Sequence, residues 1–350
     1  MTRAADAAPH DRLSGHEAHG LVAAWHLPAG SERLDLALEL PACDLRIVGA
    51  AGRLLASAGA GARGYFHRHA SGRTHHLETG AGEDLEPLVL LHGGAGGGAN
   101  WFAVLEPLAR RRRVLAPDLP GFGLSTPIPA GTPLGRHAAR SVASWLRGIG
   151  VRRFALAGTS FGGLVAAHLA ARRDVSVTRL VLVDSAGLGR AVHPFLRLAS
   201  TALIRPAVGV TTRTGARAVF RGLMVHRAGA IPARRREALL DYIHACGEAG
   251  VDRMVAGALR HFVGWTGQRE RADLHVLPEV ECPVLAVSGA HDAIFPARHA
   301  RRLARRLEDA GACVIPNAGH SPMWETPDAL VEAVRPFLEA RVPAEDIPCP

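Results

Sequence analysis

The order of apolar and polar positions from about residue 61 onward predicts strands and helices in alternation. Residues 133–147 and 327–340 repeat their apolar side chains with the period of a helix. Short continuous apolar runs, typical of strands buried on both faces of a sheet, occur at Leu88–Leu91, Val114–Pro117, Phe154–Ala157, Leu180–Val183, Val284–Ser288 and Cys313–Ile315. The alternation predicts an α/β protein with a doubly wound, mainly parallel sheet covered by helices.

This alternation stops between residues 184 and 283, where no run resembles a strand and stretches such as 233–246 have a helical period. We therefore expect an inserted helical lid. The pattern divides the chain into a core of residues 61–189 and 276–341, a helical cap over 190–275 and a tail over 342–350. Residues 1–60 form an extension without an assigned role. Within it, 34–40 alternate like a strand, and we expect the first thirty residues to be partly disordered.

Charge and cysteine content narrow the class of protein. The net charge of +9 would suit a nucleic-acid partner, but every basic residue is an arginine and the arginines are dispersed, so we expect none. The five cysteines form no C-x-x-C pair, which gives no sign of disulfides or zinc, and we expect reduced, buried thiols. No apolar run reaches the roughly 18 residues of a membrane helix. We expect a cytoplasmic monomer or homodimer without a membrane span.

A candidate nucleophile follows the third of the predicted strands. The sequence Gly158-Thr159-Ser160-Phe161-Gly162 lies between that strand and a helical stretch, which is the setting in which G-x-S-x-G forms a nucleophile elbow. Flanking glycines allow the sharp turn that exposes the serine hydroxyl. Ser160 is therefore the predicted nucleophile.

A serine needs a base to accept its proton and a carboxylate to orient that base. His320 follows the last predicted strand, and Asp292 follows the strand before it. Because the carboxyl ends of parallel strands meet at one edge of a sheet, both residues should lie near Ser160. Asp184, at the end of Leu180–Val183, is the alternative acid, and we expect Glu325 to cap or pack.

The glycine-rich stretch after Leu88–Leu91 is a candidate oxyanion hole. His92 is followed by Gly93-Gly94-Ala95-Gly96-Gly97-Gly98, and backbone N–H groups of such a loop can stabilise a developing oxyanion. We expect one donor at Phe161, directly after the nucleophile, and the other near Gly94. No lysine follows these glycines, which excludes a Walker phosphate-binding loop.

Together these motifs resemble the α/β-hydrolase fold superfamily over roughly residues 61–341. The matching segments are Leu91–Gly94, Asp118–Ser125, Gly158–Gly163, Gly289–Pro296 and Gly319–Glu325. The resemblance implies a Ser160, His320 and Asp292 triad that hydrolyses a small to medium carboxylic ester through an acyl-enzyme, without cofactor or metal. Serine at position 160 argues against the dehalogenase and epoxide hydrolase branches, which use aspartate there.

Alternatives within this resemblance stay open. The glycine-rich loop and Asn100 also resemble C–C hydrolases of aromatic ring-cleavage products, although Ser321 stands where those enzymes usually have tryptophan. Acyl transfer or perhydrolysis would use the same triad, and a non-catalytic binding protein would use the same fold.

Several further side chains are candidates for the substrate pocket or for a metal. The predicted pocket residues are Asn100, Trp101, Phe195, Met224 and Trp265. One of Arg197, Arg221 and Arg260 could clamp a substrate carboxylate, although each also suits a solvated surface. We expect His67, His69, His75 and His76 to occupy the surface of strands or a hairpin rather than to bind a metal, because no carboxylate or cysteine shares their pattern.

Overall fold

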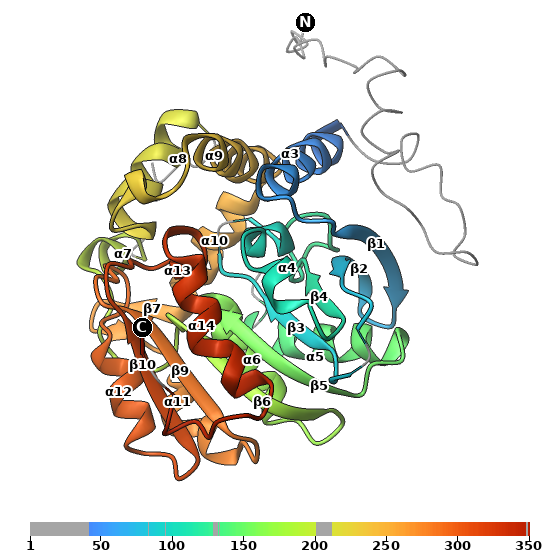
Figure 1. Cartoon of the computed structure of the whole chain (residues 1–350). Helices are drawn as coiled ribbons and strands as arrows, with labels where there is room; N and C mark the ends of the chain where they lie inside the picture. Colours follow the sequence, from blue (N-terminus) through green and yellow to red (C-terminus); the bar gives the residue numbers. More distant parts are fainter. Residues whose placement is uncertain are drawn as a thin grey trace, which may run out of the picture.

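A central sheet of eight strands organises the protein (Figure 1). The computed structural model describes residues 42–82, 84–94, 96–128, 132, 134–200, 212–347 and 349–350. The strand order is β1-β2-β4-β3-β5-β6-β9-β10, and all neighbours from β4 to β10 run parallel. The strands are β1 (Arg63–His69), β2 (Gly72–Thr79), β3 (Leu88–Leu91), β4 (Val114–Pro117), β5 (Arg153–Thr159), β6 (Ser176–Val183), β9 (Val284–Gly289) and β10 (Ala310–Ile315).

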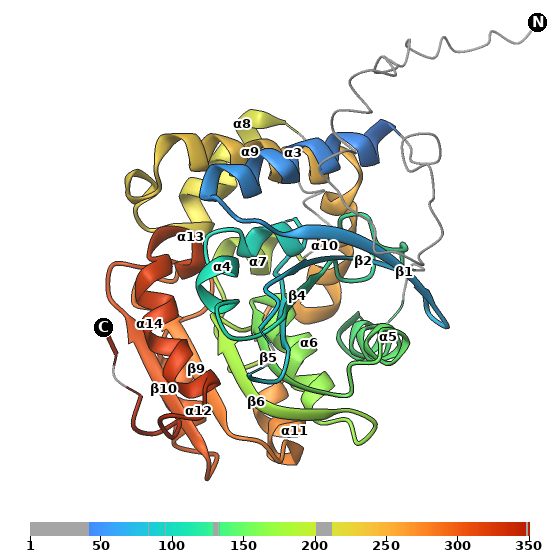
Figure 2. The same cartoon turned by 45° about the vertical axis from the view of Figure 1, so that its right-hand side comes forward.

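Helices cover both faces of this sheet (Figure 2). On one face α4 (Leu105–Leu108) contacts α14 (Pro327–Leu338). On the other, α6 (Phe161–Ala170) contacts α5 (Leu134–Gly148) and α11 (Ala272–His275). The side chains of β3 and β4 are fully buried between these layers, as the continuous apolar runs predict. The doubly wound, mainly parallel sheet is thereby confirmed.

The segment between β6 and β9 is mainly helical, as predicted. Its longer elements are α7 (Pro194–Ala199), α8 (Arg213–Val219), the π-helical turn Phe220–Met224, α9 (Ala233–Glu248) and α10 (Val251–Phe262). The expectation that it holds no strand is wrong in one detail: β7 (Val263–Gly264) and β8 (Gly267–Gln268) form a short antiparallel hairpin. Two-residue strands are too short to produce an alternating pattern.

The N-terminal region contains a helix that the sequence pattern does not reveal. Helix α3 (Ala42–Ala58) packs along α9 and also contacts the 3₁₀ turn Gly98–Trp101 (Figure 2). Ile47 and Leu54 are almost completely buried. The strand-like stretch 34–40 and the first thirty residues lie outside the described residues. Helix α3 therefore connects the lid to the loop that follows β3.

The histidines of the first hairpin are not all at the surface, so that prediction is wrong for two of them. His75 and His76 are buried on β2 because this strand lies between β1 and β4. His75 Nδ1 lies 2.8 Å from Asp118 Oδ2, and His76 packs against Trp145. Their neighbours on β1, His67 and His69, are partly exposed.

Two of the described cysteines differ from the expected buried thiols. Cys246 and Cys313 are buried, whereas Cys282 is partly buried and Cys349 is exposed. All four are free thiols. No helix in the described ranges is both long and apolar enough to cross a membrane.

The contact between α3 and α9 leads to a stability prediction. Replacing the fully buried Leu54 with alanine removes apolar burial and leaves a cavity, so the free energy of unfolding should fall by about 2–5 kcal/mol. The adjacent, exposed Arg53 provides the control, since Arg53→Ala should change it by less than about 0.5 kcal/mol. Urea unfolding would measure both, and equal midpoints for the two variants would contradict the packing of α3.

Candidate active site

Ser160 occupies the turn between β5 and α6. Its φ of 53° lies in the left-handed region, which is costly for a residue other than glycine. The turn closes because its neighbours lack side chains: a Cβ on Gly158 would overlap the backbone of Gly162, and a Cβ on Gly162 would overlap the carbonyls of Leu91 and His92. The strained turn places Ser160 in the wall of a cavity.

His320 and Asp292 meet beside this turn. His320 Nδ1 lies 3.1 and 3.0 Å from the two carboxylate oxygens of Asp292, and both side chains are buried. The Asp292 carboxylate also accepts hydrogen bonds from the backbone N–H groups of Ile294 and Phe295. Burial by itself would raise the pKa of Asp292. The positive charge of His320 and its hydrogen bond outweigh this effect and hold the pKa of Asp292 below its usual value. Asp292 is therefore an anion fixed against the histidine.

The second nitrogen of this histidine remains available. Within the described part of the chain, no hydrogen bond is recorded for the buried His320 Nε2. His320 lines the same two cavities as Ser160. An imidazole held at Nδ1 and open at Nε2, next to a serine, is the arrangement that proton transfer from a hydroxyl requires.

In the described part of the chain, His320 Nδ1 pairs with Asp292 and not with Asp184, the alternative acid. Its Oδ1 accepts the N–H of Gly289 at 3.0 Å, and Asp184, Asp292 and His320 each offer an atom within 4.8 Å of the others. Burial, followed by repulsion from Asp292, raises the pKa of Asp184 well above its usual value. Such a trio could share a cation or a proton, and the raised pKa favours a proton on Asp184.

The glycine-rich loop is held in place by His92. The N–H of Leu119 donates to His92 Nε2 at 2.8 Å, which leaves the proton on Nδ1 to bond the carbonyl oxygen of Gly93 at 2.7 Å. Burial lowers the pKa of His92, consistent with this neutral form. Because the Gly93 carbonyl and the Gly94 N–H belong to one peptide group, His92 orients the predicted oxyanion donor. The other predicted donor, the Phe161 N–H, begins α6 and has no partner within that helix.

Asp118 supports the far end of the same loop. Its Oδ1 accepts the N–H of Gly98 at 2.7 Å, and its Oδ2 contacts His75 and accepts the N–H of Leu124. Burial opposes its ionisation, but the His75 charge and these hydrogen bonds hold the pKa of Asp118 below its usual value. Asp118 belongs to one of the segments that match the family in the sequence. Its supporting role depends on a contact with His75, 43 residues away, which the spacing of the motif does not predict.

Two cavities meet at Ser160 and His320. The larger, of about 190 Å³, is almost entirely apolar, and the smaller has about 20 Å³. Besides Ser160, His320 and the oxyanion candidates Gly94 and Phe161, the larger one is lined by Phe122, Ala186, Val192, Leu196, Val219, Leu223, Met224, Val255, Ala256, Leu259, Phe262, Val263, Gln268, Ile294 and Phe295. Its one further polar side chain, Gln268, bonds the backbone of Gly187 and Gly189.

The structure separates the predicted pocket residues into two groups. Met224 lines both cavities, and Asn100 and Trp101 line the smaller one. Phe195 and Trp265 line neither and are instead 38% and 68% exposed. They lie on α7 and in the β7–β8 turn, next to other residues that form the cavity wall. The sequence therefore indicates the right segments but not the direction of their side chains.

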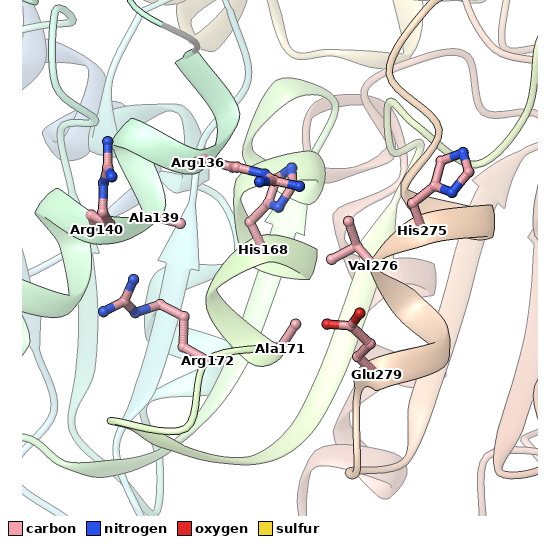
Figure 3. Close-up of a pocket in the computed structure, with 9 residues that line it drawn as sticks. All are labelled: Arg136, Ala139, Arg140, His168, Ala171, Arg172, His275, Val276 and Glu279. Atoms are coloured by element: carbon pink, nitrogen blue, oxygen red, sulfur yellow. The ribbon is translucent and has the colours of Figure 1, made fainter.

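A third hollow lies away from this centre. Figure 3 shows Arg136, Arg140 and Arg172 gathered around it, with His168 and Glu279 among its other lining residues. His168 and Arg172 lie at or beyond the C-terminal end of α6, whereas Ser160 lies at the N-terminal end. A helix of this length spans about 15 Å, so this basic hollow is separate from the serine.

The fold and the serine, histidine and aspartate arrangement together define a hydrolase of the α/β type. The family described as alpha/beta hydrolase fold matches residues 86–327, and the chain belongs to that family. The resemblance stated from the motifs is thereby confirmed.

Similar proteins include several named enzymes. A Pseudomonas putida protein, the dihydrolipoyllysine-residue acetyltransferase component of an acetoin cleaving system, is 31% identical over 73% of this chain, which spans 64% of that protein's length. A 2-hydroxy-6-oxo-6-(2'-aminophenyl)hexa-2,4-dienoic acid hydrolase of Metapseudomonas resinovorans is 29% identical over 77% of this chain and 88% of its own. Among solved structures, a bacterial membrane phospholipase A has a TM-score of 0.66 and 27% identity, covering 83% of this chain and 92% of its own.

The buried acid pair leads to a prediction about stability and pH. Because the folded-state pKa of Asp184 is raised, wild-type stability should carry a cost that is absent below the ordinary aspartate pKa of about 3.9 and grows as pH rises above it. Asp184→Asn keeps a neutral donor and suits the φ of 42°. The melting temperature of Asp184→Asn, taken relative to that of the wild type, should therefore increase as the pH rises from 4 to 8.

The exposed Asp309 provides the matched control, because Asp309→Asn should not reproduce this trend. A difference between Asp184→Asn and wild type that stays constant from pH 5 to 8 would mean that Asp184 is ionised in the folded protein.

Proposed function

We propose that the protein is a serine hydrolase that cleaves carboxylic esters with an apolar group, through an acyl-enzyme on Ser160. The observation that carries the proposal is the strained Ser160 turn beside a buried His320–Asp292 pair. Strained backbone that the surrounding structure holds in place is typical of functional sites.

The geometry supports the following mechanism. Ser160 Oγ attacks the ester carbonyl while His320 Nε2 takes its proton, and the Asp292 carboxylate stabilises the resulting imidazolium. The N–H groups of Phe161 and Gly94 would bond the oxyanion, with the positive end of the α6 dipole behind them. His320 then protonates the departing alcohol, and water releases the acid by the same sequence.

The apolar cavity favours an uncharged substrate group. No arginine is among the described residues that line either cavity at Ser160, so none of Arg197, Arg221 and Arg260 reaches it there. A dienoic acid, as named for the C–C hydrolase relative, brings a carboxylate that would lose its hydration without a cationic partner. This absence favours an ester over the C–C hydrolase reaction. Cytoplasmic location, oligomeric state and the absence of a cofactor stay predictions.

Active-site labelling tests the mechanism. A fluorophosphonate should form one adduct on the wild type, and intact-mass detection should find none on Ser160→Ala and very little on His320→Ala. Asp292→Asn should keep the fold but lower kcat for ester hydrolysis by a factor on the order of 10³–10⁴, because the imidazolium loses its anion. A folded wild-type protein that takes no label and cleaves no ester would refute the proposal.

Filling the cavity tests the substrate assignment. Ala256 lines the large cavity from α10, so Ala256→Phe should spare the methyl esters of C2–C4 acids and lower kcat/KM for C8–C12 acids by about tenfold or more. Ala56→Phe, the same change at an exposed position on α3, is the control and should leave both classes unchanged. Titration of the released acid would give kcat/KM for each ester. An equal loss of kcat/KM at every chain length would contradict the assignment of this cavity as the acyl site.

A further inference from the structure

Exposed apolar side chains gather at one place on the lid. In the described part of the chain, the exposed large hydrophobic residues are Phe195, Leu198 and Trp265, at 38%, 42% and 68%. Phe195 and Leu198 are three residues apart on α7 and so share a face of that helix. Trp265 lies in the β7–β8 turn, and its carbonyl accepts a hydrogen bond of 2.7 Å from Arg197 Nε of α7. The three side chains therefore stand on two adjoining elements, α7 and the β7–β8 hairpin, and we call them the lid patch.

The same two elements also form the wall of the large cavity. Leu196 of α7 and Val263 of β7 line the cavity that contains Ser160. The lid patch residues lie within two positions of these two in sequence, but they line neither cavity at Ser160 and are exposed. The patch and part of the cavity wall therefore belong to the same two elements. Exposed apolar side chains that gather on one part of a protein surface mark a candidate binding face.

The charges around the patch indicate its partner. Residues 190–200 and 260–271 carry Arg190, Arg197, Arg260, Arg269 and Arg271, against the single carboxylate Glu270. Glu270 pairs with His168 and Arg271 with Asp273. No ion pair is recorded, among the described residues, for the other four arginines. Arg190 and Arg197 donate to the backbone carbonyls of Thr266 and Trp265, which holds their charge close to the patch.

We propose that the lid patch docks the enzyme on an anionic lipid surface and that the ester enters the cavity from that surface. A tryptophan with leucine and phenylalanine, ringed by arginines, is the composition that binds at the boundary of headgroups and acyl chains. Arginine stems can lie along apolar chains while their guanidinium groups reach lipid phosphates. The identity of the substrate as a lipid ester rests on the proposed function, whereas the docking itself does not.

Vesicle binding measures the docking directly. We expect the Ser160→Ala protein to float with vesicles of phosphatidylglycerol and phosphatidylcholine, and more weakly with phosphatidylcholine alone. Trp265→Ser should weaken binding by about tenfold, since one large apolar side chain no longer enters the lipid. Arg260→Gln together with Arg269→Gln should weaken binding to the anionic vesicles only. The exposed Arg53 of α3 gives the matched control, and Arg53→Gln should bind as wild type.

Fluorescence adds a readout at the patch itself. Trp101, Trp145 and Trp324 are buried, at 2%, 0% and 4% exposure, whereas Trp265 is exposed. The fifth tryptophan, Trp25, lies outside the described residues, so the experiment uses a Trp25→Phe background. In that background vesicles should shift the emission to the blue, and Trp265→Phe should lose this shift while still floating. Binding without any shift from Trp265 would overturn the proposed face.

The remaining outcomes separate this inference from the proposed function. A protein that cleaves soluble short esters but does not bind the anionic vesicles would overturn the docking and leave the hydrolase proposal intact. A protein that binds the vesicles through Trp265 but cleaves no ester would do the opposite. A dimer in sedimentation that Trp265→Ser converts to a monomer, without vesicle binding, would show that the patch contacts a second copy of the chain instead.

Discussion

The close approach of the Ser160 turn to the loop after β3 is the constraint on which the rest of the site depends. Gly162 makes it possible, because a side chain there would meet the carbonyls of Leu91 and His92, while Gly158 lets the turn itself close against Gly162. The approach brings the N–H of Phe161 and the peptide group of Gly94 to the same cavity. Flattening this turn would therefore move the Ser160 hydroxyl and the predicted oxyanion donors together.

Buried carboxylates join the loops around that turn. Asp118 binds the N–H of Gly98, and Glu325, as expected for a capping residue, accepts the N–H groups of Gly319 at 2.7 Å and Arg227 at 2.5 Å. Gly319 precedes His320, whereas Arg227 belongs to the lid. A buried carboxylate is stable only when its oxygens are bonded, so each of these residues links segments far apart in sequence. The position of the lid and that of the histidine are thereby coupled through Glu325.

The sequence predicts the sheet and the serine, histidine and aspartate neighbourhood well, because both depend on local patterns. Continuous apolar runs mark strands such as Val114–Pro117 to the residue, and parallel topology brings the strand ends together. Helix α3 escapes this reasoning because alanine and glycine fill much of it and blur its apolar period. Its stability comes from packing on α9, a contact across nearly two hundred residues that no local window contains.

Side-chain direction is the other property that the sequence leaves undetermined, and in the lid it has a functional consequence. Phe195 and Leu196 are neighbouring large apolar residues, yet one is exposed and the other lines the cavity. Because α7 and the β7–β8 hairpin carry both surfaces, a substitution that moves either element would change the cavity wall and the patch together. Under the proposed function, the cavity that accepts a larger apolar substrate and the patch that docks on the lipid surface would then both depend on these two short elements. Because the proposed apolar substrate would dissolve poorly in water, an apolar cavity and an apolar patch on the same elements would meet one physical demand.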